Sequence, residues 1–263
     1  YNIQGPSFTV STACSSGGDA INTACMCMQS GKADIMLAVG AESVLCPLVI
    51  YSLANAKALS RRNDSPSTAS RPFDVTRDGF VIGEGGGALV LETDEHALAR
   101  GAKIYAEIRG CGNTDDAYHV TAPHPEGRGA IACMKQAIAE AGINPADIGY
   151  INAHGTATNK GDTVETSSIK KVFGNTLPYV SSTKGATGHM MGAGGITETI
   201  TCIKAIETGT VPPTINLNEV DPECAGIDFV ANTAKKAEIN FAMSNAFGFG
   251  GQNSSIIVGK YGK

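Results

Sequence analysis

The sequence lacks the features that would assign the chain to several simple classes of protein. It has no long apolar run of the kind that spans a membrane, although 42% of its 263 residues are hydrophobic. Its formal net charge of -5 gives no basic excess to attract nucleic acid. We therefore expect a globular chain without a membrane span or a nucleic-acid partner, long enough to bury one large core or two fused ones.

Cysteine is present, but not in the pattern of a disulfide scaffold or a metal site. Eight cysteines in this length do not reach the density of a secreted disulfide scaffold, which favours a reducing cytoplasm. Cys25 and Cys27 lie close in sequence, but no second closely spaced Cys or His pair completes a zinc pattern. We therefore expect no metal. The cysteines are Cys14, Cys25, Cys27, Cys46, Cys111, Cys133, Cys202 and Cys224.

A glycine-rich stretch at residues 83–87 superficially resembles a dinucleotide-binding fingerprint. That fingerprint must open a helix, whereas this stretch leads into the apolar residues 88–91, which have the pattern of a strand. The comparison excludes a nicotinamide site here.

Cys14 is the most informative single residue. It stands where an alternating, β-branched run meets a glycine-rich turn and then an alanine-rich helical pattern. At such a strand-to-helix elbow, unpaired backbone N–H groups and the helix dipole favour negative charge, so we expect a stabilised, nucleophilic thiolate. A lone cysteine is more often a small buried hydrophobic residue, so this assignment depends on partners elsewhere in the chain.

Two later segments supply candidate partners. Residues 152–162 follow a short apolar strand and present His154 at its C-terminal end, a usual place for catalytic groups in α/β folds. Residues 181–195 present Lys184 and His189 among small residues that allow a substrate to approach closely. Each segment alone is weak evidence for a catalytic site, because single histidines and lysines are usually structural or solvated.

A third segment, residues 245–253, is a glycine-flanked aromatic loop around Phe249 that enters an apolar strand. Taken in this order, the four segments resemble the β-ketoacyl synthases, the condensing enzymes of the thiolase-like superfamily. The resemblance covers essentially the whole chain. Its motifs are the Cys14 elbow, His-Gly-Thr-x-Thr from His154, Lys-x-x-x-Gly-His from Lys184 and Gly-Phe-Gly-Gly around Phe249, with further matches at residues 60–64, 71–74, 77–80 and 211–214.

Within that family, the residues in these motifs are most similar to those of the type II fatty-acid elongation enzymes. Modular polyketide ketosynthases usually have Glu where this chain has Asn152, and initiating synthases have Asn where this chain has His189. Non-catalytic chain-length factors lack the residue equivalent to Cys14. Two departures from the family pattern, Gln252 for Thr and residues 185–186 for a Ser-Met pair, remove no reacting group.

Strand and helix patterns alternate along the chain, which predicts α/β layers. The resemblance implies a thiolase-like α-β-α-β-α sandwich of two similar halves, residues 1–112 and 113–263, joined through the polar residues 113–127. The family places further strands and helices before the nucleophile, so we expect an N-terminal portion to be missing and the first half to be incomplete. We predict strands at residues 8–12, 35–39 (buried), 87–92, 104–110, 150–153 and 179–182 and near Phe229, Ala242 and Ile256, and helices at 16–29, 94–100, 130–141, 163–173 and 195–208.

The resemblance also implies roles for the reacting residues. Cys14 would accept an acyl group, because sulfur attacks a thioester as thiolate and leaves again readily. His154 and His189 would donate N–H bonds to the enolate formed when a malonyl thioester loses carbon dioxide. The backbone N–H groups of Cys14 and Phe249 would form an oxyanion hole, and Phe249 would swing as a gate between its glycines.

Supporting roles follow from the same resemblance. Lys184 would give electrostatic support to the thiol, with Glu198 as its partner, and Asp162 would hold the His154 loop. The residues expected to bind substrate are Thr156, Thr158, Thr121 and Phe247.

The implied partner is an acyl carrier protein bearing acyl and malonyl groups. The phosphopantetheine arm arrives on that partner, so we expect no cofactor of the chain's own. Carrier proteins of this kind are strongly acidic and so is this chain, so a local basic patch is needed; Lys57, Arg61 and Arg62 form the best cluster. The family pairs subunits through the strand before the nucleophile, here residues 8–12, which implies a homodimer.

Three alternatives stay open on the sequence. A polyketide-type ketosynthase would carry the same reacting residues. A truncated subunit would bind carrier protein without acyl transfer. A thiolase would use a second cysteine as base, but none of the late cysteines lies in a glycine-rich loop.

Overall fold

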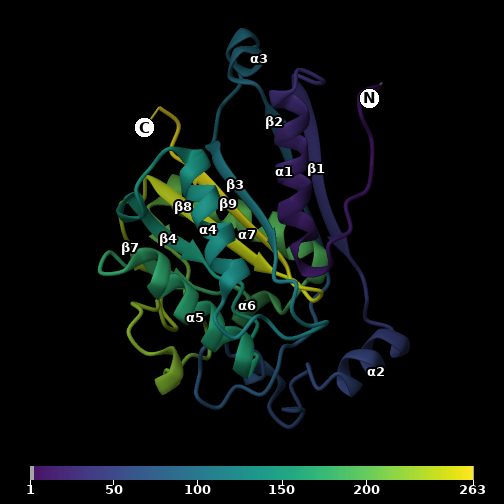
Figure 1. The fold of residues 1–263 in the computed structure, drawn as a ribbon, viewed down its shortest axis with the longest axis vertical. Helices are drawn as coiled ribbons and strands as arrows, with labels where there is room; N and C mark the ends of the chain where they lie inside the picture. Colours follow the sequence, from purple (N-terminus) through teal and green to yellow (C-terminus); the bar gives the residue numbers. More distant parts are fainter. Residues whose placement is uncertain (1–2, 263) are drawn as a thin grey trace.

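A computed structural model describes residues 3–262. Its centre is a mixed five-stranded sheet in the order β3-β9-β8-β4-β5 (Figure 1). β4 runs parallel to both β5 and β8, whereas β9 runs antiparallel to both β8 and β3. The strands are β3 (Glu107–Asp115), β4 (Ile148–Asn152), β5 (Tyr179–Ser181), β8 (Phe241–Phe247) and β9 (Gln252–Gly259).

Helices cover both faces of this sheet and create two apolar cores. On one face, α4 (Arg128–Ala141) and α5 (Asn159–Phe173) pack against it through residues such as Met134 and Ile169, which are fully buried. On the other face lie α1 (Ser16–Gln29) and α7 (Gly194–Thr208). The central sheet is therefore buried on both sides, as the apolar run of β9 requires.

A second sheet lies beyond α1 and α7. It has two antiparallel strands, β1 (Ile35–Glu42) and β2 (Gly85–Glu92). The prediction that residues 35–39 form a buried strand is wrong for one of its faces. Ala38 packs inward, whereas the alternate side chains, including Leu37, are about half exposed because no described residue covers the outer face. The described layers are therefore helix, sheet, helix and sheet, in the predicted order.

Two predicted strands do not form. Residues 8–12 are extended, but none of residues 3–262 lies beside them as a paired strand, and β-branched alternation alone cannot make a ladder. Phe229 makes only an isolated bridge to Val180. The other predicted strands and helices form, most of them with ends that differ from the predicted ones.

Several shorter elements complete the described chain. The sequence did not reveal α2 (Pro47–Asn55). The others are α3 (Asp94–Ala99), α6 (Lys184–Thr187), β6 (Thr210–Val211), β7 (Lys235–Lys236) and the 3-10 turns at Ala13–Ser15, Pro66–Thr68, Pro145–Asp147, Met191–Ala193 and Pro222–Cys224.

No helix within residues 3–262 has both the length and the apolar character needed to cross a membrane.

Glycines let the N-termini of α1 and α7 approach each other more closely than any side chain allows. A Cβ on Gly17 would lie 2.7 Å from the backbone nitrogen of Ile196, and one on Gly195 would lie 2.4 Å from that of Gly18. Contacts this short leave no room for a methyl group. The approach places the turn before α1, which holds Cys14, against the segment that enters α7.

We expect Gly195→Ala to lower the free energy of unfolding by about 1–3 kcal/mol, because the new methyl group forces the two helices apart. Urea unfolding measures this loss. Gly149→Ala is the matched control, since its Cβ would meet nothing closer than 3.7 Å. Equal stabilities of the two variants would show that the helices are not in contact as described.

Candidate active site

Cys14 lies at the floor of a pocket, on the strained turn that precedes α1. The residue before it, Ala13, has a φ of +51°, a left-handed conformation that residues with a Cβ rarely adopt. The turn continues as a 3-10 helix, Ala13–Ser15, directly into α1. This geometry aims the Cys14 side chain into a cavity of about 100 Å³, where the thiol is 8% exposed.

Two histidines share the pocket with the thiol. His189 Nε2 lies 3.0 Å from Cys14 Sγ, within hydrogen-bond distance. The His189 ring is held edge-on between two other rings, with centroids 5.2 Å from Phe80 and 5.3 Å from His154. The pairing of the backbone of His189 with residues 81–83 fixes its position further. The sequence-predicted trio of one cysteine and two histidines is therefore assembled in one place.

The electrostatics of Cys14 differ from the sequence expectation. Burial raises the pKa of the Cys14 thiol to about 11, and this effect outweighs the backbone N–H of Phe249 and the positive charge of Lys184, which lower it. The prediction of a preformed thiolate is therefore wrong, because the helix N-terminus acts here in a site that water hardly reaches. A proton acceptor is required, and His189 Nε2 is in position for it.

Both histidines are neutral. Burial and the nearby Lys184 charge lower the pKa of His154 and of His189 well below the ordinary value. A neutral imidazole offers one nitrogen as a donor and the other as an acceptor. Each ring can therefore accept a proton or donate a hydrogen bond without carrying a permanent charge.

Lys184 forms a buried ion pair with Glu198, the partner expected from the sequence. Burial raises the pKa of the Glu198 carboxyl, and the Lys184 charge opposes that shift. Lys184 begins the short helix α6, where its carbonyl accepts a hydrogen bond of 2.6 Å from the Ser70 hydroxyl. The structure thus fixes one cation close to the thiol and both imidazoles.

The His154 loop is held chiefly by an acid that sequence reasoning missed. Glu165 accepts hydrogen bonds from the backbone N–H groups of His154, at 2.8 Å, and Gly155, at 2.7 Å. Asp162, one turn earlier on α5, accepts from Ala157 and Phe73 at 3.1 and 2.8 Å. The only signal in the sequence was the spacing of two acids by three residues at the start of a helix, which places them on one face.

Burial raises the pKa of Asp162 to about 6 and that of Glu165 to about 7. Each of these carboxyls binds its proton more tightly in the folded chain than in the unfolded chain, so their contribution to stability is lost as pH rises through these values.

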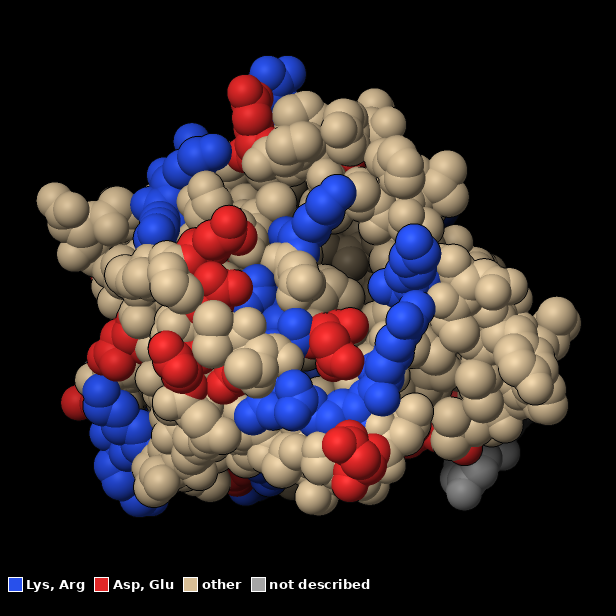
Figure 2. Space-filling model, turned by 90° about the horizontal axis from the view of Figure 1, so that it is seen from below, with Lys and Arg blue, Asp and Glu red and all other residues tan. Residues whose placement is uncertain are grey.

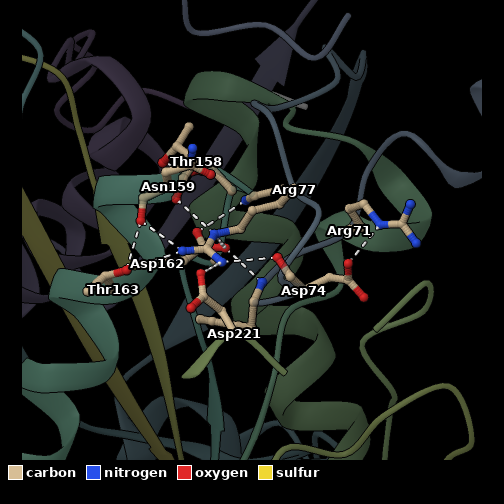
Figure 3. Close-up of polar contacts among 12 residues, drawn as sticks. Arg71, Asp74, Arg77, Thr158, Asn159, Asp162, Thr163 and Asp221 are labelled. Atoms are coloured by element: carbon tan, nitrogen blue, oxygen red, sulfur yellow. Dashed lines mark hydrogen bonds and ion pairs between the residues drawn. The ribbon is translucent and has the colours of Figure 1, made fainter. Parts of the chain in front are cut away.

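Arg77 connects the start of α5 to two other loops (Figure 3). Its guanidinium donates to the carbonyl of Asn159 at 2.9 Å and to the Asp221 carboxylate at 2.6 Å, and its Nε lies 3.4 Å from Asp162. A second ion pair, between Arg71 and Asp74, lies beside it. Planar guanidinium groups suit such multiple contacts, so Arg77 fixes the helix end that carries the pocket wall.

The predicted substrate-binding residues line the same pocket. The hydroxyls of Thr156 and Thr158 lie 3.1 Å apart on one wall. Phe247 ends β8 with its ring 6.1 Å from that of His154. Thr121 completes the group, and Phe249, predicted as an oxyanion donor and gate, lines the pocket beside it.

The predicted basic patch is outside the pocket, on the segment that follows α2. Lys57 and Arg61 are exposed, whereas Arg62 is half-buried and donates to the Thr76 carbonyl at 2.9 Å. Leu53 of α2 lines the pocket, so the patch begins four residues from its wall. Figure 2 shows Lys and Arg side chains flanking a hollow on this face of the molecule.

The part of the chain that the structure describes contains no group of three or more His, Cys, Asp or Glu side chains arranged to hold a metal ion.

Comparison with known proteins gives consistent matches along the chain. The family model for the beta-ketoacyl synthase N-terminal domain matches residues 1–97, and that for the C-terminal domain matches residues 105–218. The chain is 48% identical to 3-oxoacyl-[acyl-carrier-protein] synthase 2 of Rhizobium meliloti (strain 1021), over 99% of this chain and 62% of that protein. It is 47% identical to the mitochondrial 3-oxoacyl-[acyl-carrier-protein] synthase of Arabidopsis thaliana, over 98% of this chain and 57% of that protein. The chain thus spans about three fifths of the length of these relatives.

Solved structures share the fold. A beta-ketoacyl synthase from Burkholderia phymatum STM815 superposes with a TM-score of 0.92 at 41% identity, over 95% of this chain and 60% of that one. The ketosynthase of a type II polyketide synthase, solved in complex with its acyl-carrier protein, gives a TM-score of 0.94 at 38% identity, over 97% and 63%. These likenesses confirm the thiolase-like fold, and this chain spans about three fifths of the matched structures.

We expect Lys184→Met to lower the free energy of unfolding by about 3–5 kcal/mol, because it leaves the buried Glu198 charge unpaired. The double variant Lys184→Met/Glu198→Leu should recover most of that loss. Lys204→Met breaks an exposed pair and should cost less than about 1 kcal/mol. Urea unfolding of the four proteins measures these differences; a double variant as unstable as the single one would contradict the buried pairing.

Proposed function

Because the chain belongs to the β-ketoacyl synthase family, we propose that it carries the condensing site of a 3-oxoacyl-[acyl-carrier-protein] synthase, which elongates fatty acids with malonyl units. The observation that carries this proposal is the 3.0 Å contact between Cys14 Sγ and His189 Nε2 in a pocket shared with His154. The reaction joins an acyl group on sulfur to a decarboxylated malonyl group.

In the first half of the reaction, Cys14 takes the acyl group from its carrier. The S–H proton passes to His189 Nε2 as sulfur attacks the thioester carbonyl, since a thiol with a pKa near 11 does not ionise alone at neutral pH. The backbone N–H groups of Cys14 and Phe249, which already point at the sulfur, stabilise the developing oxyanion. The departing pantetheine sulfur takes the proton, which leaves acyl-Cys14 and a free carrier thiol.

In the second half, malonyl-carrier protein loses carbon dioxide, and the electron pair of the broken carbon–carbon bond forms an enolate. Neutral His154 and His189 donate N–H bonds to the enolate oxygen, for which His189 takes the tautomer that has its proton on Nε2 rather than on Nδ1. The enolate carbon then attacks the acyl carbonyl, the bond to Cys14 Sγ breaks, and the sulfur leaves as a thiolate that takes up a proton from water, the one proton that the overall reaction consumes. Lys184 keeps both imidazoles neutral between these steps, because its charge disfavours a second cation nearby.

The implied partner is an acyl carrier protein that approaches the side of the pocket near α2. The exposed Lys57 and Arg61 would meet an acidic surface there, although the whole chain is acidic. The walls formed by Thr156 and Thr158 would then hold the amides and hydroxyl of the phosphopantetheine arm. No cofactor of the chain's own is needed for these steps.

A polyketide-type ketosynthase is the second candidate, favoured by the likeness to the ketosynthase of a type II polyketide synthase. The chemistry at Cys14 would be the same and the products would differ, because a polyketide chain keeps its carbonyl groups. A purely carrier-binding role is less well supported, since Cys14, His154 and His189 are all present and in contact distance.

We further propose a cytoplasmic homodimer. Residues 8–12 are extended and Phe8 is 53% exposed, so this segment has the open backbone groups that a second copy would pair with. The free cysteines fit a reducing compartment.

The proposal predicts that incubation with acyl-carrier protein adds the acyl mass to one peptide, that containing Cys14. Peptide mass spectrometry of the intact protein and of Cys14→Ser measures this. Adding malonyl-carrier protein should then discharge the adduct and release carbon dioxide. An adduct on another cysteine, or discharge without decarboxylation, would favour a different transferase.

For the carrier surface, we expect Arg61→Glu/Arg62→Glu to raise the KM for carrier-bound acyl substrate about tenfold or more, because charge reversal repels an acidic partner. The KM for a small acyl thioester should not change. Lys32→Glu, an exposed charge reversal after α1, is the control. Equal effects on both substrates would show that these arginines act on the fold or the pocket rather than on the carrier.

A further inference from the structure

A buried carboxylate that none of the proposed steps uses lies directly behind the nucleophile. Asp19 is 4% exposed and belongs to the first turn of α1, where the helix dipole favours negative charge. It does not line the pocket, and its carboxylate accepts a hydrogen bond from Thr12, two residues before Cys14. Buried carboxylates are retained only where they are well hydrogen-bonded, so its partners indicate what it does.

One oxygen of Asp19 holds both ends of the turn that contains Cys14. Oδ2 accepts from the Thr12 hydroxyl at 2.6 Å and lies 3.0 Å from the Ser15 hydroxyl. The backbone N–H of Ser15 also donates to the Thr12 carbonyl, at 3.1 Å. Ala13, between them, has the left-handed φ of +51°. Hydrogen bonds to a charged acceptor are stronger than neutral ones, so Asp19 supports a backbone conformation that Ala13 would not otherwise prefer.

The other oxygen ties the turn to the central sheet. Oδ1 accepts from Asn113 Nδ2 at 2.7 Å, and Asn113 lies on β3. β3 pairs with β9, which begins three residues after Phe249, and in that ladder Asn113 is opposite Ser254. The carboxylate therefore connects the Cys14 turn to the strand pair that carries the Phe249 loop.

We propose that Asp19 is a positioning residue that holds Cys14 Sγ in register with His189 Nε2 and with the backbone N–H of Phe249. The inference rests on the proposed function only where acyl transfer is the readout. Without the carboxylate, the turn would relax towards the ordinary conformation for Ala13, and the sulfur would leave the position at which both partners reach it. Reaction rates are sensitive to such shifts, since a displacement of about 1 Å can cost a hundredfold.

The test compares four proteins: the parent, Asp19→Asn, Asp19→Asn/Asn113→Asp and Ile169→Val. Asp19→Asn keeps the size of the side chain but removes the charge and one of the two acceptor oxygens, so the bonds to the turn hydroxyls or to Asn113 must reverse or be lost. The double variant restores a complementary set of donors and acceptors. Ile169→Val loses buried volume in the core behind α5 and reports what lower stability alone does.

We measure three quantities for each protein. They are the unfolding midpoint in urea, the rate of alkylation of Cys14 by iodoacetamide from about pH 8 to about pH 12, and the kinetics of acyl transfer from a small acyl thioester. For Asp19→Asn we expect kcat for acyl transfer to fall about ten- to a hundredfold with KM nearly unchanged, and the alkylation profile to move to higher pH. The double variant should recover both, and Ile169→Val should change neither.

Loss of stability in Asp19→Asn with an unchanged alkylation profile and kcat would overturn the inference, because it would show a structural role only. Failure of the double variant to recover reactivity would also overturn it. If the parent protein itself transfers no acyl group, the proposed function fails, but the alkylation profiles still decide whether Asp19 positions the thiol.

Discussion

The site depends on one buried positive charge, that of Lys184. Burial alone raises the pKa of Cys14 and of Glu198 and lowers that of the two histidines. The ammonium group opposes the first two shifts and reinforces the last two. The result is a neutral thiol beside neutral imidazoles, with the lysine charge paired to a buried glutamate. Proton transfer from sulfur to imidazole creates a charge pair that burial disfavours, so the transfer has to accompany the attack of sulfur on the thioester.

The fold places the Lys184 charge and the Cys14 thiol close together. Glycines at the starts of α1 and α7 let the helix ends meet, which brings the Cys14 turn against the start of α7, the helix that carries Glu198. From the other side, Glu165 and Arg77 fix the loop and helix end that present His154. Polar groups buried at these junctions are costly unless satisfied, so the loops that build the pocket are held by side chains rather than by ladders.

Much of this arrangement was predictable from local sequence. The Cys14 turn, both histidines and Lys184 stand in short motifs, and alternating periodicities located most helices and strands. What failed required knowledge of distant partners. Residues 8–12 have the composition of a strand, but none of residues 3–262 pairs with them, and residues 35–39 are apolar on a face that no described residue covers. Glu165 and Asp19 went unnoticed because their importance comes from backbone amides and hydroxyls that only folding brings to them. The thiolate expectation failed because burial of the thiol outweighs the backbone N–H groups and the Lys184 charge that favour the thiolate.

The most direct test of the account is a titration of the Cys14 thiol itself, followed by the ultraviolet absorbance of the thiolate as a difference between the protein and Cys14→Ser. A neutral thiol that depends on His189 for its proton transfer predicts a midpoint near pH 11. A midpoint at or below neutral pH would contradict the account, because it would show that a thiolate is already formed before any substrate arrives and that Lys184 and the helix N-terminus outweigh burial.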